Sequence, residues 1–450
     1  MRRAAVLASI FMGASMSGAR AVDVAIKSQL SQSIEANDNY QLATPSPGMT
    51  YPSVSTLTLD TIARTPTMLF TGSANLSYRT YFGNGAEALV PGVDKGARAS
   101  IEKKIDNQTT FNLESSWQVR DAATIQREET GTSTVGGDVV TTTINGGFKR
   151  QLNSVDTITW SARATSLTSP PSGNSSSSAT ASAPPVTSST DVSTTGAWIH
   201  QVNSTTKLTP SVLFDSINYQ NSTNTQIMIW KGMLGLDTQL TKRLTFKGSA
   251  GGTVIKLTQD VSGNPLGSFN PTPFPTGTAA SATAAAWVAD LLVTYKLGHN
   301  DNFSLAAAQT VGPDTLGTIR KTDIAGVVLS HAINHWSNLS LSTDFSRQLS
   351  SSSTVDLYSA SASYDHRLAQ DWHMALTYRF RHRISDATSL NSTSSTSANS
   401  NSILLVVRRD VTILPAATGS APIPAPDSST ALMASSAIWA MTGRFANNSY

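Results

Sequence analysis

Polar and apolar side chains alternate strictly from Asp371 to Ile384. One parity is apolar or aromatic, and holds Trp372, Met374, Leu376, Tyr378, Phe380 and Ile384. The other parity holds His373, Ala375, Thr377, Arg379, Arg381 and Arg383. Because successive side chains of a β-strand point to opposite faces, this segment is predicted to be a long strand with one apolar and one basic face.

The same alternation recurs along the chain. It is clear in MLFTGSANLSYRTYF (68–82), ARASIEKKI (97–105), FNLESSWQVRD (111–121) and DTITWSARA (156–164). Strands of soluble sandwiches are usually about five or six residues long, whereas strands that cross a membrane at a tilt need about 9–11 residues. These segments are therefore predicted to be membrane-spanning strands.

Short and long connections alternate between the predicted strands. The short turns lie near residues 63–66, 105–108, 151–156, 203–206, 241–243, 298–302, 333–336 and 368–371. The longer polar loops lie near residues 38–50, 83–95, 121–138, 168–194, 219–226, 259–282, 310–317, 348–354 and 385–401. This asymmetry predicts an all-β fold, a transmembrane antiparallel up-and-down β-barrel of about 18 strands, with short periplasmic turns and long extracellular loops.

The first 21 residues have the order of a secretory signal peptide. Arg2 and Arg3 precede an apolar run from Ala4 to Met16, and Ala19-Arg20-Ala21 supplies the small residues of a cleavage site. We therefore expect residues 1–21 to be a signal peptide and residues 22–414 to form the barrel. Residues 415–450 are rich in Pro, Ala and Ser, and are expected to form a periplasmic or partly disordered tail.

Composition excludes several classes of function. Only 14% of the residues are charged and none is cysteine, so disulfides and thiolate metal sites are excluded. Loss of the three arginines of the signal peptide would leave 29 basic and 29 acidic residues, which gives no support to nucleic-acid binding. His331 and His335 have helical i, i+4 spacing, but no Glu follows the first of them, as a metalloprotease helix requires. We expect no cofactor, no catalytic residue and no enzymatic activity.

The parity of the strands also selects the side chains that face the barrel interior. The predicted pore-lining residues are Arg79, Arg98, Glu102, Glu114, Arg120, Arg163, Lys247, Arg379, Arg381 and Arg383. These charges can brace the wall through internal salt bridges, or they can set up a transverse field that selects hydrated or anionic solutes. The sequence leaves both readings open.

Two long segments, Ser169–Thr190 and Ser389–Ser402, are uncharged and rich in Ser. They hold too few apolar side chains to form a core of their own, so both are predicted to be solvated surface loops. A role of these loops in adhesion or reception remains the alternative interpretation.

The stretches IEANDNYQL (34–42) and LTLDTIARTPTMLFTGSANLSYRTYFGNGAE (57–87) resemble a family of proteobacterial outer-membrane β-barrel porins. Some relatives in that family are associated with exopolysaccharide export. The resemblance implies a location in the cell outer membrane and supplies no catalytic motif. It covers the N-terminal hairpins, while the rest of the chain is similar in architecture alone.

Two function classes follow from these observations. The first is a channel or export pore for hydrophilic solutes, and the second is a plugged structural or adhesive barrel that acts through its surface loops. The expected partners are outer-membrane lipids and lipopolysaccharide, the barrel-assembly machinery, and hydrophilic or anionic solutes. Nucleic acid is not expected as a partner.

Overall fold

The computed structural model describes residues 23–87, 89–130, 137–168, 188–220, 225–259, 280–313, 319–350, 353–389 and 392–414. They form one sheet of 18 strands. The strands are β1 (Asp23–Asn37), β2 (Tyr51–Arg64), β3 (Met68–Phe82), β4 (Gly92–Lys104), β5 (Thr109–Asp121), β6 (Asp138–Gln151), β7 (Asp156–Thr168), β8 (Ser189–Gln201), β9 (Thr206–Tyr219), β10 (Gln226–Gln239), β11 (Leu244–Gln259), β12 (Ala280–Lys296), β13 (Asp301–Pro313), β14 (Ile319–Asn334), β15 (Ser337–Leu349), β16 (Ser353–Ala369), β17 (Trp372–Ser389) and β18 (Ser392–Leu414). A 3-10 turn, η1 (Asn84–Ala86), and a helix, α2 (Ala122–Thr130), lie in two of the longer connections.

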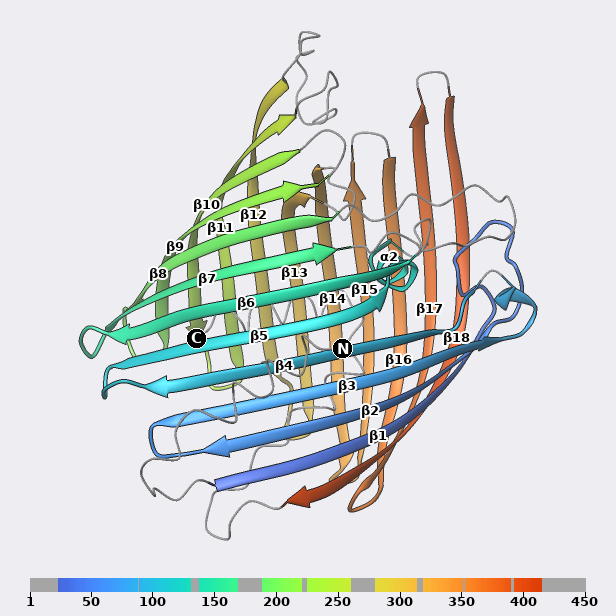
Figure 1. Cartoon of the computed structure of the whole chain (residues 1–450), viewed down its shortest axis with the longest axis horizontal. Coiled ribbons are helices and arrows are strands. Elements are labelled where there is room, and N and C mark those ends of the chain that lie inside the picture. The colour runs from blue at the N-terminus through green and yellow to red at the C-terminus, as the bar shows by residue number, and fades with distance from the viewer. Residues whose placement is uncertain are drawn as a thin grey trace, which may run out of the picture.

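Each strand pairs antiparallel with the next one along the chain, and β1 pairs antiparallel with β18. That last pairing closes the sheet, so Figure 1 shows a barrel whose strands run obliquely around a common axis. Closure gives every strand two neighbours and leaves no open edge. The predicted fold class, a closed antiparallel barrel of about 18 strands, is confirmed.

Short turns gather at one end of the barrel and longer connections at the other, and we name these ends the short-turn rim and the long-loop rim. The turn between β4 and β5 shows why so few residues suffice. The carboxylate of Asp106 accepts the backbone N–H groups of Gln108 and Thr109 at 2.7 and 2.6 Å. These hydrogen bonds hold the pKa of Asp106 below its usual value, because they stabilise the ionised carboxylate.

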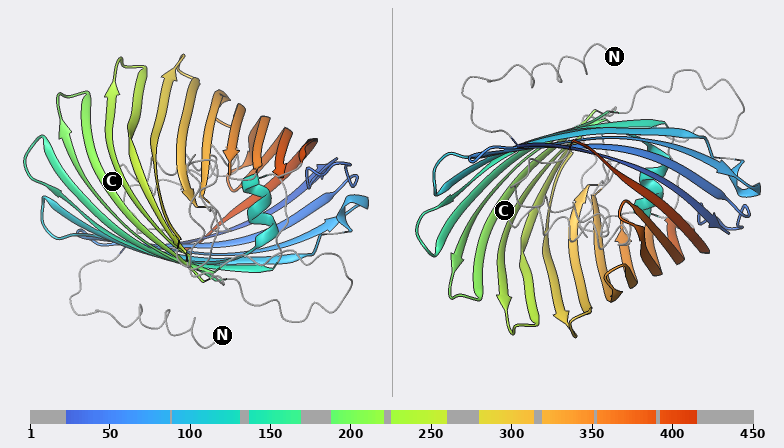
Figure 2. Two further views of the ribbon diagram at one scale, coloured as in Figure 1. Left: turned by 90° about the horizontal axis from the view of Figure 1, so that it is seen from above. Right: turned by 90° about the horizontal axis from the view of Figure 1, so that it is seen from below.

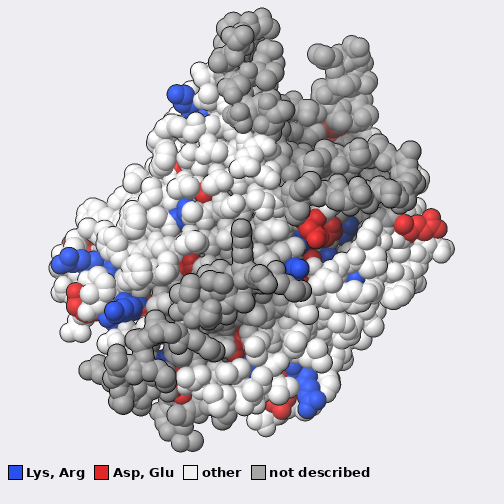
Figure 3. All heavy atoms as spheres, viewed as in Figure 1, with Lys and Arg blue, Asp and Glu red and all other residues white. Residues whose placement is uncertain are grey.

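Apolar side chains cover the outside of the wall. On β17 the outward side chains of Trp372, Leu376 and Tyr378 are 41–46% exposed, whereas the inward Ala375 and Thr377 are each 6% exposed. In Figure 3 most of the visible wall carries no charge, and charged atoms gather near its edges and at the opening beside α2. An apolar exterior of this extent is typical of a surface that contacts lipid or another protein. Within the described ranges, no helix has the length and apolar character to cross a membrane.

The loop prediction for Ser389–Ser402 is wrong. The backbone of β17 pairs with that of β18 up to Ser389 and Ser392, so this Ser-rich segment extends a hairpin at the long-loop rim. Backbone pairing needs no apolar side chain, and composition alone therefore could not exclude a strand here. Most of the other Ser-rich segment, residues 169–187, lies outside the described residues, as do the predicted signal peptide and the tail at 415–450.

Candidate functional site

Three pairs of opposite charge lie on the inner face of the wall. Arg79 on β3 contacts Asp94 on β4 at 2.8 Å, and Arg98 on β4 contacts Glu114 on β5 at 2.7 Å. Lys247 on β11 lies 3.3 Å from Asp237 on β10. The two side chains of the Arg79–Asp94 pair are about 15% exposed, so this ion pair is the best shielded of the three. Four of the predicted pore-lining residues thus form cross-strand ion pairs.

The inner face also carries Glu102, Arg120 and Arg163, which lie at different distances from the two rims. Glu102 lies toward the short-turn rim opposite Asn112, and Arg120 lies at the long-loop rim opposite Val139. Arg163 is exposed on β7, and its Nε donates to Thr165 Oγ1 at 3.0 Å. The structure therefore does not bring all ten predicted residues into one cluster.

Arg379, Arg381 and Arg383 form an inward ladder on β17. Consecutive members are two residues apart, which corresponds to about 6.5–7 Å along a strand. Ser361 and Ser359 on β16 lie opposite Arg379 and Arg381. Small serine side chains leave room above them for long guanidinium groups, as the alternation in the sequence predicted.

Acidic groups near the ladder come from other strands. Asp344 on β15 lies opposite Ser359, which in turn lies opposite Arg381. Asp344 and Glu35 on β1 are both close enough to interact with the charge of Arg381. The Nε atoms of Arg379 and Arg383 have no hydrogen-bond partner in the part of the chain that the structure describes. The ladder is thus partly balanced by carboxylates and partly unpaired.

The helix α2 projects into the barrel, a feature that the sequence analysis placed in a polar loop. Figure 2 shows α2 inside the ring of strands from both ends. Asp121 caps the helix, because its carboxylate accepts the N–H and the hydroxyl of Thr124 at 2.9 Å each. An Asp followed by the helix-favouring run AATIQREE was the signal that could have predicted α2.

The inner wall at β9–β11 carries an aliphatic cluster near the long-loop rim. A buried cluster there includes Ile217 on β9, Ile227 on β10, and Ile255 and Leu257 on β11. All four side chains have inward parity, and Ile227 and Leu257 are fully buried. This aliphatic cluster thus covers one part of the inner wall, beside the inward acids Asp191 and Asp215.

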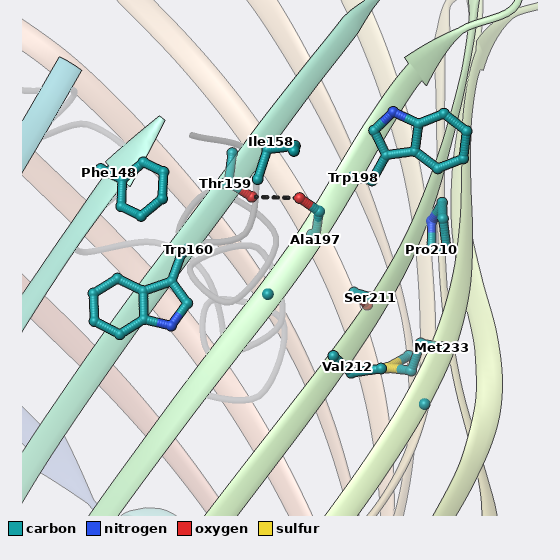
Figure 4. Close-up of a pocket in the computed structure, with 12 residues that line it drawn as sticks. Phe148, Ile158, Thr159, Trp160, Ala197, Trp198, Pro210, Ser211, Val212 and Met233 are labelled. Carbon is teal, nitrogen blue, oxygen red and sulfur yellow. Dashed lines mark hydrogen bonds between the residues drawn. The ribbon is translucent and has the colours of Figure 1, made fainter. Parts of the chain in front are cut away.

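A shallow groove of about 910 Å³ lies on the outside of the wall rather than in the barrel interior. It is lined by the outward side chains of Phe148, Trp160 and Trp198 (Figure 4), and by Gly196 and Gly232. Because it faces away from the interior, it is separate from any path through the barrel.

Histidines lie mainly near the short-turn rim, and three of them hydrogen-bond to an acid or a hydroxyl group. Asp156 accepts from His200 at 2.8 Å, Asp301 contacts His331 at 2.6 Å, and Ser337 contacts His366 at 2.8 Å. Across the described ranges, no group of three or more His, Asp or Glu side chains is placed to hold a metal ion. These three histidine contacts are hydrogen bonds between neighbouring strands near the short-turn rim.

No family model matches the chain, and no curated protein matches it. Solved structures with a similar fold include the FrpB iron transporter from Neisseria meningitidis, at 8% identity and a TM-score of 0.48, covering 88% of this chain and 82% of that one. OccK2 from Pseudomonas aeruginosa is similar at 9% identity and a TM-score of 0.47, over 87% of this chain and 98% of that one. The ferric-catecholate import receptor Fiu from E. coli K12 matches at 9% identity and 0.43, over 85% and 81%.

These similarities carry no argument about substrate or mechanism at such values. The fold rests on the strand pairing of this chain itself. The family resemblance of residues 34–42 and 57–87 is supported only at the level of barrel architecture.

Proposed function

We propose that this protein is an outer-membrane channel for hydrophilic solutes. The observation that carries the proposal is the division of the closed wall into an apolar outer face and an inner face with arginines, lysines and carboxylates. Charged side chains in a membrane barrel are stable where they face a hydrated interior. Barrels of about 16–18 strands are wide enough for an aqueous path.

The proposed channel has expected partners and an expected class of solute. Outer-membrane lipids and lipopolysaccharide would contact the apolar wall, and the barrel-assembly machinery would insert it. Export of an exopolysaccharide rests on the family resemblance of residues 34–42 and 57–87 alone. Anionic solutes are favoured by the arginine ladder on β17, which places three guanidinium groups along one inward face.

A location in the outer membrane predicts heat-modifiable mobility. The protein is expected in the outer-membrane fraction and should migrate differently on gels before and after boiling, because a closed barrel resists detergent until it is heated. Fractionation of cells followed by electrophoresis with and without boiling measures this. Recovery as a soluble periplasmic protein with a single mobility would contradict the proposed location.

A channel predicts ionic conductance. Purified, folded protein added to a planar lipid bilayer should produce stepwise increases in current, because an open lumen carries hydrated ions. The control is the boiled protein, which should produce none. Folded protein that inserts without conducting would overturn the channel proposal.

One observation favours a second candidate, a plugged barrel that acts through its surface. Both α2 and the loop 38–50 make contacts inside or across the long-loop rim. A barrel that shifts on heating yet never conducts would support this second function.

A further inference from the structure

The loop 38–50 and α2 come from different parts of the wall and meet at the long-loop rim. The contact is a stack of the Arg127 guanidinium on the ring of Tyr40, 4.4 Å from the ring centroid. The Tyr40 ring also lies 5.7 Å from the ring of Tyr81, an inward residue of β3. We name the loop 38–50 together with α2 the cross-lumen bar, because they join β17 and β18 to β3 and β4 across the inside of the barrel.

The helix end of the bar is fixed to β3 and β4. Arg79 donates through Nη1 to Thr124 Oγ1 at 2.6 Å, and through Nη2 to Asp94 at 2.8 Å. Ala122 and Thr124 are 1% and 4% exposed, so the first turn of α2 is packed on the wall. This anchoring places Arg127, one turn further along, at a fixed position inside the rim.

The loop end of the bar is fixed to β17 and β18. Asn39 donates to the backbone oxygen of Asn399 at 3.0 Å, and Arg383 Nη1 donates to the backbone oxygen of Leu42 at 3.2 Å. Leu42 is 1% exposed. The ladder arginine Arg383 and the helix arginine Arg127 thus hold residues only two positions apart, Leu42 and Tyr40.

Arg127 is buried, at 5% exposure, and two of its donors lack an acceptor within the described side chains. These two donors are its Nε and Nη1 atoms. Burial raises the pKa of Tyr40, so its hydroxyl stays neutral and offers no negative charge to Arg127. Asp94 and Asp121, beside the helix start, already accept hydrogen bonds from Arg79 and Thr124.

Buried guanidinium donors without hydrogen-bond partners are unfavourable, since they have lost water and gained no acceptor. A bound oxyanion would place negative charge beside the guanidinium and would accept hydrogen bonds from its N–H groups. Arg383 holds the same loop through the backbone oxygen of Leu42, and among the described residues its Nε also has no hydrogen-bond partner.

We infer that Arg127, stacked on Tyr40, is a binding site for the carboxylate, sulfate or phosphate group of a solute that enters at the long-loop rim. The inference rests on the proposed channel function and names the class of solute and where it first binds. The cross-lumen bar then acts as the selective constriction of the path.

Inorganic sulfate is the probe, because it remains ionised across the working pH range. In a planar bilayer carrying chloride current, added sulfate should reduce the conductance of the natural protein. The substitution Arg127→Gln should weaken this block by about tenfold or more, the loss expected for a charged hydrogen bond. The matched control is Arg347→Gln, which removes an arginine paired with Asp356 on another part of the wall and should leave the block unchanged.

A second measurement keeps the site testable if the barrel does not conduct. Sulfate should raise the temperature at which the folded, detergent-solubilised protein loses its unboiled gel mobility, and Arg127→Gln should abolish this shift. Arg127→Lys retains the positive charge and should keep part of the sulfate-induced temperature shift. This variant is the control for a folding defect in Arg127→Gln. If the protein does not conduct but sulfate still raises this temperature, the channel proposal is overturned and the anion-site proposal stands.

Equal sulfate effects in the natural protein and in Arg127→Gln, or no sulfate effect on the natural protein, overturn the anion site. This holds whether or not the barrel conducts.

Discussion

Replacing Leu405 with arginine is expected to destabilise the inserted barrel by about 2–4 kcal/mol, the effect of an arginine on the lipid face near the middle of a membrane. Leu405 on β18 lies between Ile34 on β1 and Leu376 on β17, and all three side chains are outward and exposed. A guanidinium at this position would contact acyl chains with no acid beside it. The unboiled gel species should therefore be lost at a lower temperature than in the natural protein.

The neighbouring leucine provides the matched control. Leu404 faces inward, opposite Glu35 on β1 and Thr377 on β17. Leu404→Arg makes the same chemical change one residue away, but puts the new charge beside a carboxylate in the proposed hydrated interior. We expect the Leu404→Arg barrel to keep most of its resistance to heat. Equal losses in both variants would contradict the division of the wall into lipid and lumen faces.

Replacing Arg379, Arg381 and Arg383 together with glutamine is expected to shift the reversal potential of the channel toward cations. The triple variant removes three positive charges from one inner strand, while the inward acids Asp344 and Glu35 remain. Glutamine keeps much of the length and the hydrogen-bonding ability of the side chain but carries no charge. Bilayer recordings across a salt gradient measure the shift.

The same variant separates selectivity from bracing. If the three arginines only brace the wall, the triple variant should unfold at a lower temperature and keep the natural ion preference. Their loss would then weaken the packing of β17 against β16 and β18 without changing the path of the ions. In the described part of the chain, the Nε atoms of Arg379 and Arg383 make no hydrogen bond to the wall, so these two donors do not brace it. A conducting triple variant with the natural reversal potential would retire the selectivity hypothesis.

The alternation of side chains determined the faces of the strands. A strand has a period of two, so the outward parity of Trp372, Leu376 and Tyr378 and the inward parity of the ladder could be read directly from the residues. The alternation of short and long connections likewise determined the strand number and the order of the hairpins. These are local properties, and local patterns report them well because each depends on neighbours in the chain.

Tertiary structure decided what each inward charge meets. Glu35 and Asp344 approach Arg381 from strands far from it in the sequence, and only closure of β1 on β18 brings Glu35 to β17. The alternation of side chains likewise did not predict three other features. These are the inward course of α2, the stack of Arg127 on Tyr40 and the extended β17–β18 hairpin. Periodicity assigns a side chain to a face, but its partners follow from register, curvature and closure, which are properties of the whole barrel.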